Sequence, residues 1–248
     1  MTQPVELTVR LRASAARRVL VPVVAVLVVL AFAAQVARYK LSVPFKVTHL
    51  FDSDEKSNFP TGFKLLTLLL SSVLFAVVAG VKRRSADRWF RHWVGLSVAF
   101  ALLFVDETAT LHQTLSNGIR HYHATSGVLR YAWVLVFIPL TIAFGRVYLG
   151  FLGALPRPFR NLLLLAAAGF AGGSGGGELL KGAVSTRYGE QSLPFGLSAA
   201  VSDSLEMIGL AILVVALLEL LEQLRAGVLL RFEGDRRPAS DDRQASRE

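Results

Sequence analysis

The sequence predicts an all-α integral membrane bundle of six transmembrane helices with both termini in the cytoplasm. Of the 248 residues, 53% are hydrophobic and only 18% are charged, whereas about a quarter of a typical soluble domain is charged. The apolar residues also form six long blocks, and a helix needs about 20 such residues to cross a bilayer. The chain has no cysteine, which excludes a disulfide scaffold and a cysteine zinc site.

The six predicted helices make up a transmembrane domain at 18–225, between a cytoplasmic segment at 1–17 and a polar tail at 226–248. Stretches such as 20–34 and 205–218 are apolar nearly all round, unlike an amphipathic helix of a soluble protein. The tail has charges of both signs and no apolar periodicity, so we expect it to be disordered. The helices are expected at about 18–37, 62–81, 89–116, 130–152, 160–180 and 196–223.

The first apolar block also has a second interpretation. Arg17 and Arg18 precede it, and Ala31-Phe32-Ala33 resembles a cleavage site, as in a secretory signal peptide. Because the block is longer than the usual apolar core of a signal peptide, we favour a retained membrane anchor.

Basic residues gather in the connections that the predicted topology places on one side of the membrane. The positive-inside rule makes that side the cytoplasm. Most of the net charge of +9 is therefore an orientation signal, and we expect no nucleic-acid partner. Trp89, Trp93 and Trp133 occur where an interfacial aromatic belt is expected. The basic residues are Arg10, Arg12, Arg17, Arg18, Lys82, Arg83, Arg84, Arg88, Arg91, Arg157, Arg160, Arg225, Arg231, Arg236 and Arg237.

Most acidic residues inside the predicted helices fall toward the extracytoplasmic side, apart from Glu219 and Glu222 at the cytoplasmic end of the sixth helix. The third and fifth helices run outward and carry their acidic residues late, whereas the sixth runs inward and carries them early. Ionisable residues in a membrane are costly and mark function by default, and several carboxylates together need a compensating cation. We therefore predict one outward-facing site in which carboxylate oxygens of these three helices converge within about 5 Å.

Position assigns a role to each candidate residue of this site. Asp203 and Glu206 are three residues apart and share a helix face, whereas neighbouring residues differ in direction by about 100°. Oxygen ligands suit Mg²⁺, Mn²⁺ or Ca²⁺, and imidazole adds Zn²⁺, so we expect a divalent metal cofactor whose identity stays open. The candidates are Asp106, Glu178, Asp203 and Glu206 as metal ligands, Glu107 and His112 as general acid or base, and Asp52, Asp54 and Glu55 as secondary loop candidates.

Several of these residues also have a structural interpretation. Glu178 and Lys181 are three residues apart and can neutralise each other. Asp203 follows Ser202 near the predicted start of a helix, where Asp often acts as a cap. His112 can face the outer loop.

A glycine-rich tract lies in the fifth predicted helix. Gly169 and Gly173, like Gly172 and Gly176, are four residues apart, which is the small-xxx-small pattern of closely packed membrane helices. Such a segment can also unwind and line a cavity. The tract matches the nucleophile pattern G-x-S-x-G, but the sixth helix has no histidine to act as its base.

Several polar motifs resemble a pattern in uncharacterised bacterial multi-pass membrane proteins, some of them loosely labelled multidrug transporters. The motifs are residues 51–55 with 58–61, Asp106-Glu107 with His112, Gly177-Glu178, and residues 206–209, within about residues 45–215. The resemblance implies that these polar positions form one site. A weaker resemblance is to alkaline ceramidase-like membrane hydrolases, which use His, Asp and Ser around zinc. Here the fifth and sixth helices lack the paired histidines of those enzymes.

Three functions remain open from the sequence, and it does not decide whether the protein is an enzyme. The leading hypothesis is metal-assisted chemistry on a lipid-like substrate at the extracytoplasmic face. The second is a proton- or cation-coupled transporter that uses the same carboxylates. The third is a non-catalytic membrane partner protein. The expected location is the plasma membrane, with the lipid bilayer and a lipid or amphiphilic small molecule as partners, in an oligomeric state that the sequence leaves open.

Overall fold

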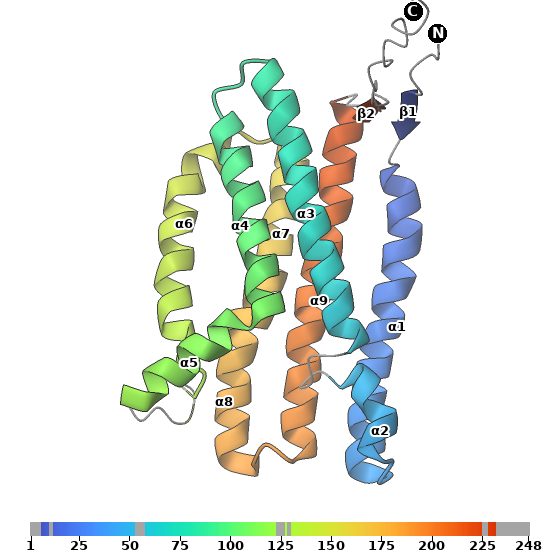
Figure 1. The fold of residues 1–248 in the computed structure, drawn as a ribbon, viewed down its shortest axis with the longest axis vertical. Helices are drawn as coiled ribbons and strands as arrows, with labels where there is room; N and C mark the ends of the chain where they lie inside the picture. The colour runs from blue at the N-terminus through green and yellow to red at the C-terminus, as the bar shows by residue number, and fades with distance from the viewer. Residues whose placement is uncertain are drawn as a thin grey trace, which may run out of the picture.

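The computed structural model describes residues 6–9, 12–52, 58–122, 127, 130–224 and 228–231. Within them the chain forms an elongated bundle of helices, shown in Figure 1. Six helices of this part are long and apolar enough to cross a membrane. The prediction of a helical multi-pass membrane protein with six spans is therefore confirmed.

The six spans run roughly along one axis, and shorter elements lie at the ends of the bundle (Figure 1). The spans are α1 (Ala13–Lys40), α3 (Phe59–Arg84), α4 (Phe90–Ala109), α6 (Val134–Ala154), the continuous run of α7 (Arg157–Ala171), π-helix η3 (Gly172–Gly176) and α8 (Gly177–Tyr188), and α9 (Leu193–Gln223). The shorter helices are α2 (Phe45–Thr48), η1 (His49–Phe51) and α5 (Leu111–Tyr122).

Two strands, β1 (Glu6–Val9) and β2 (Val228–Arg231), pair antiparallel with Glu6 opposite Arg231. The β2 residues belong to the segment that the sequence analysis expects to be a disordered tail. The rest of that tail lies outside the described residues.

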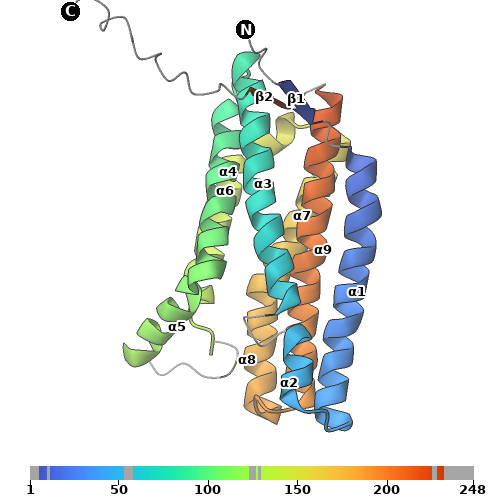
Figure 2. The same cartoon turned by 45° about the vertical axis from the view of Figure 1, so that its right-hand side comes forward.

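Helix α9 is the centre of the bundle. It packs against α1, α3, α7, η3 and α8, and Figure 2 shows it between α1 and α3. In its most apolar window 72% of the residues are buried, against 11% to 50% in the other spans. This central place explains why α9 is apolar nearly all round, since protein rather than lipid covers most of its surface.

Two helices begin three residues before their expected starts because of their caps. The Asn58 side chain accepts a hydrogen bond from the Thr61 backbone N–H at 2.7 Å at the start of α3. The Ser192 hydroxyl accepts one from the Phe195 N–H at 3.4 Å at the start of α9. Each cap is followed by a proline in the first turn, where its missing N–H costs no helical bond.

The end of the bundle where α1 begins and α9 ends, together with the α3–α4 and α6–α7 connections, is called the basic end below. An aromatic core lies just inside it. The ring centroids of Trp93 and Phe151 are 4.9 Å apart, and those of Trp93 and Phe75 are 6.2 Å apart. Trp93 is only 1% exposed, so this residue is a core residue and not part of an interfacial belt.

The third predicted helix, 89–116, is broken in the structure into α4 and α5. Thr110 adopts left-handed backbone angles, with φ 56° and ψ 36°, which a non-glycine residue rarely adopts within a helix. The Asp106 carboxylate accepts a hydrogen bond from the His112 N–H at 2.8 Å and so holds the break. As a result, α5 leaves the direction of the bundle axis (Figure 1).

Candidate functional site

A buried ionic cluster forms around Lys64, and we call Lys64, Glu107, Asp203 and Glu206 the Lys64 cluster. The Lys64 Nζ lies 2.7 Å from Asp203 Oδ1, 3.1 Å from Glu206 Oε2 and 3.3 Å from Glu107 Oε1. Lys64, Asp203 and Glu206 are each less than a tenth exposed, and Glu107 is partly buried. Helices α3, α4 and α9 therefore meet at one ammonium group.

The Lys64 cluster holds more potential negative charge than positive charge. Three carboxylates face one ammonium, which leaves an excess of two negative charges when all four groups are ionised. Uncompensated charge is expensive in the low dielectric between membrane helices. The buried Asp203 Oδ2 makes no hydrogen bond to any described residue, so it is an acceptor open to a proton or a cation.

The geometry of α9 explains how two carboxylates reach the same ammonium. Asp203 and Glu206 are three residues apart and so lie on one face of the helix. Asp203 lies well inside α9, whose cap is Ser192, so the interpretation of Asp203 as a helix cap is wrong. The neighbouring Ser202 hydroxyl donates to the Gly173 carbonyl at 2.7 Å, which fixes α9 against η3 beside the cluster.

Lys64 is the member of the cluster that the sequence analysis missed. It is the only ionisable residue between 59 and 81, and an isolated charge in an apolar block is a signal of function. Sequence reasoning placed the compensating cation outside the chain, as a metal, whereas the chain supplies it from α3.

Asp106 and Glu107 are adjacent in α4 but have different partners. Glu107 joins Lys64, whereas Asp106 lies 2.9 Å from the His112 Nδ1 through its Oδ2. The His112 ring in turn packs against Trp133, with centroids 5.4 Å apart. The structure thus gives Asp106 and His112 a shared place at the α4–α5 break rather than in the Lys64 cluster.

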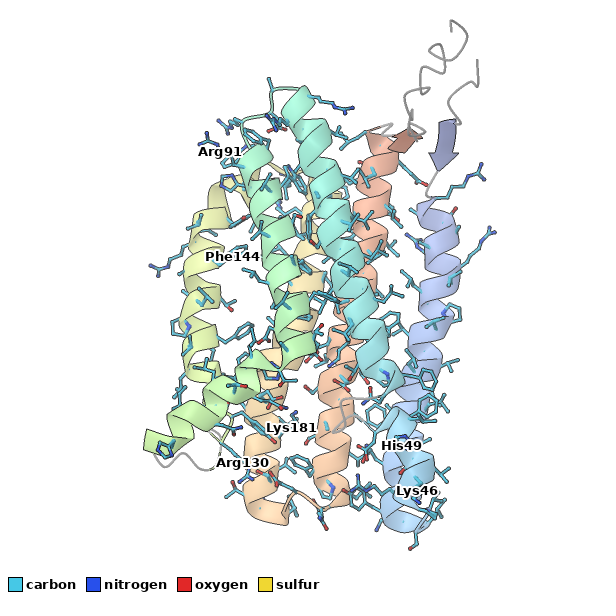
Figure 3. All side chains as sticks on the ribbon, viewed as in Figure 1. Lys46, His49, Arg91, Arg130, Phe144 and Lys181 are labelled. Atoms are coloured by element: carbon cyan, nitrogen blue, oxygen red, sulfur yellow. The ribbon has the colours of Figure 1, made fainter. Side chains whose placement is uncertain are left out.

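The remaining candidates lie in two other groups. Glu178 Oε1 and Lys181 Nζ are 2.7 Å apart, with the Tyr131 ring 5.2 Å from the ammonium; Figure 3 labels Lys181 on α8. Asp52 is 1% exposed, accepts a hydrogen bond from Gln35 at 2.9 Å and forms an ion pair with Arg38. The loop candidates Asp54 and Glu55 lie outside the described residues.

The predicted convergence of three helices on one site is found in part. Carboxylates from the third and sixth predicted helices meet at Lys64, whereas Glu178 of the fifth forms its own pair with Lys181. Over the part of the chain that the structure describes, no group of three or more His, Cys, Asp or Glu is arranged to hold a metal ion. The divalent metal and the roles that depend on it stay predictions.

The glycine-rich tract packs closely on α9, but only along one face. A Cβ added at Gly169 would lie 3.2 Å from Gly209 Cα, and one at Gly173 would lie 2.6 Å from the Ser202 carbonyl oxygen. At Gly172 and Gly176, the other predicted pair, an added Cβ meets no atom of the described residues within 4 Å. The segment does not unwind; it widens into the π-helix η3.

The model of one protein family matches residues 20–220, and its description is Domain of unknown function (DUF8692). The chain belongs to this family. The match includes every member of the Lys64 cluster and is compatible with the resemblance to an uncharacterised family of membrane proteins. No match was found among the curated proteins or among the solved structures.

Proposed function

We propose that this protein is a proton- or cation-coupled transporter of the plasma membrane, and that the Lys64 cluster is its coupling site. The observation that carries the proposal is the sharing of one buried ammonium by three carboxylates from two other helices. Such residues inside membrane proteins form ion pathways and proton relays.

The cluster links ion occupancy to helix packing. The Lys64 ammonium of α3 attracts Glu107 of α4 and Asp203 and Glu206 of α9. A proton or monovalent cation on one of these carboxylates weakens that attraction, because the same negative charge is then already neutralised. Ion binding therefore favours a different spacing of the three helices, which is the differential interaction that coupling requires.

The basic end is assigned to the cytoplasm by the positive-inside rule, which also places both termini there. Lys64 then lies about 27 Å from Lys82 along α3, at 1.5 Å per residue. In this orientation the coupling site lies in the outer half of the membrane.

Infrared difference spectroscopy during a pH titration tests the site without knowledge of the transported substrate. We expect purified protein to show a protonated-carboxyl band that disappears as the pH rises, and Glu206→Gln to lose part of it. Glu219→Gln is the matched control, since Glu219 lies on the same helix but pairs with Arg17 near the basic end. Equal bands in all three proteins would contradict a proton site in the Lys64 cluster.

A flux measurement then tests the coupled transport. Proteoliposomes containing a pH-sensitive dye are given a potassium diffusion potential or a sodium gradient, and the rate of internal pH change is followed. We expect flux in the wild type and in Glu219→Gln, and strongly reduced flux in Asp203→Asn and Glu206→Gln. Absence of flux in the wild type, or equal flux in all four proteins, would leave the cluster as a structural ion network of a partner protein.

A further inference from the structure

A cavity opens at the basic end, away from the Lys64 cluster. It has a volume of about 160 Å³ and lies between the α3–α4 connection, the end of α6 and the last turns of α9. Most of its walls are apolar or aromatic, and they include Trp89, Trp93, Leu220 and Leu224. Because Trp93 and Leu220 lie about one turn inside their helices, the cavity begins at the depth of the membrane interface.

The polar side of the cavity is the ion pair of Lys82 and Asp87, and both oxygens of the Asp87 carboxylate already have partners within the protein. Lys82 and Asp87 both line the cavity, with Lys82 Nζ 3.0 Å from Asp87 Oδ2. Asp87 Oδ1 also accepts a hydrogen bond from the Trp89 N–H at 2.8 Å. Burial alone would raise the pKa of Asp87, but these two donors lower it below the ordinary 3.8. Asp87 therefore stays ionised and bound to its own partners at neutral pH.

The α3–α4 connection, which forms the rim of the cavity through Lys82, Asp87 and Trp89, has a clear excess of positive charge. Residues 82–91 contain five basic residues and one acidic residue, and Arg83, Arg84 and Arg88 are exposed. The Arg88 guanidinium lies 4.8 Å from the centroid of the Trp89 ring, which itself forms a wall of the cavity. Cationic groups of the α3–α4 connection therefore lie on one side of the apolar cavity, at the level expected for the lipid headgroups.

We propose that this cavity binds one anionic phospholipid, with its phosphate beside the basic residues of the rim and its glycerol and first chain segment against the partly exposed Trp89 and Leu224. Charge complementarity selects an anionic headgroup, since basic groups near a membrane surface each attract anionic lipid by about 1 kcal/mol. The apolar walls select an amphiphile rather than a free phosphate, because a small anion would leave them exposed to water.

Tryptophan quenching by brominated lipids tests this proposal, because the chain has only three tryptophans. In Trp133→Phe the two remaining tryptophans, Trp89 and Trp93, line the cavity and report on it. The protein is placed in nanodiscs that contain brominated phosphatidylglycerol or brominated phosphatidylcholine at equal mole fraction. We expect stronger quenching by the anionic lipid, and unlabelled phosphatidylglycerol to relieve it.

Two matched controls locate the effect. The double variant Trp89→Phe with Trp93→Phe keeps only Trp133, near the α4–α5 break, and its quenching should not depend on the headgroup. Arg83→Gln and Arg88→Gln in the Trp133→Phe background should each weaken the preference about fivefold, the factor that corresponds to about 1 kcal/mol per charge. Arg187→Gln, which removes an exposed arginine on α8, should leave the preference unchanged.

Two results would overturn the proposal. One is equal quenching by the two lipids in Trp133→Phe, or the same preference when Trp133 is the reporter. The other is full relief of the quenching by soluble glycerol phosphate, which would mean that the rim binds an anion without a lipid chain. Neither result depends on whether the Lys64 cluster couples transport.

Discussion

The two halves of α9 are both buried, but in different ways. Toward the basic end, large aliphatic side chains such as Leu213 and Leu217 pack with Phe75 and Trp93 in one apolar core. In the first half most buried residues are small or polar, apart from Phe195 and Met207, and Asp203 and Glu206 pair with Lys64. Lipid is as apolar as leucine, so a membrane protein gains little from burying leucine itself. The first half, called the polar half below, should therefore be sensitive to charge and to close approach of the backbones. The second half, called the packed half, should be sensitive to side-chain packing.

The largest expected effect comes from Lys64→Met in α3, which removes the partner of Asp203 and Glu206 in the polar half of α9. Removing the ammonium leaves three carboxylates without their counter-charge, and breaking a buried ion pair from one side costs about 3–5 kcal/mol. We expect this loss in the free energy of unfolding in detergent micelles at neutral pH, and a smaller loss at acidic pH. Adding Asp203→Asn and Glu206→Gln to Lys64→Met should restore much of the stability. Wild-type stability of Lys64→Met would contradict the role of charge in this half.

The packed half is tested by Leu217→Ala. Leucine-to-alanine changes in a core cost about 2–5 kcal/mol, and we expect the lower part of this range because only packing contacts are lost in a membrane. Leu205→Ala is the control, since Leu205 is 40% exposed on the same helix. Thermal unfolding followed by circular dichroism compares the two variants. Equal losses would mean that the core near the basic end is no better packed than the lipid-facing surface.

Close approach in the polar half is tested by Gly173→Ala. The new Cβ would lie 2.6 Å from the Ser202 carbonyl oxygen and 2.9 Å from the Glu206 backbone nitrogen, so α9 must move away from η3. Overpacking of this kind costs about 1–3 kcal/mol. Gly172→Ala meets nothing within 4 Å and should not be destabilised. The prediction fails when the two alanine variants unfold at the same temperature.

A smaller effect is expected from Asp106→Asn at the α4–α5 break. The amide can still accept from the His112 N–H, but it no longer provides a charged partner for His112 Nδ1. A net loss of about 1 kcal/mol is typical for one such hydrogen bond. Since Asp106 does not touch Lys64, proton release measured by infrared spectroscopy should match that of the wild type.

The smallest effect is a pH dependence at the α3–α4 connection. The pKa of Asp87 is lower in the folded protein than its ordinary 3.8. Its stabilising contribution is therefore present above about pH 4 and is lost as the pH falls through the lower, folded-state value. Unfolding measured from about pH 6 downward should show this loss in the wild type and not in Asp87→Asn. Parallel curves for the two proteins would contradict it.

The fold was largely predictable because six apolar blocks and their basic connections report directly on the membrane. The starts of α3 and α9 were missed by three residues, since their caps, Asn58 and Ser192, precede the apolar blocks. The break at Thr110 was also missed, because it depends on a contact between Asp106 and His112 that spacing alone does not reveal.

The candidate site was predictable as a set of acidic residues but not as an arrangement. Asp203 and Glu206 were placed together because both lie on one helix face. The sequence makes Asp106 a ligand and Glu107 an acid or base, whereas the rotation of α4 toward α3 brings Glu107 rather than Asp106 to Lys64. Lys64 itself was overlooked because it stands alone, and its three partners come from helices far away in the sequence.

The π-helix η3 also determines how far α8 is rotated about the helix axis relative to α7. A π-helical turn holds one residue more than an α-helical turn, so it rotates everything after it by about 100° relative to an uninterrupted α-helix. Phe159 and Leu163 of α7 and Gly182 and Ser185 of α8 are all buried, although a single α-helix of this length would not keep them on one face. Deleting one residue from Gly172–Gly176 would restore the regular helix and turn the Glu178–Lys181 pair about a quarter of a turn away. The tract behaves as a one-residue insertion, and its length determines the direction of every side chain that follows it in α8.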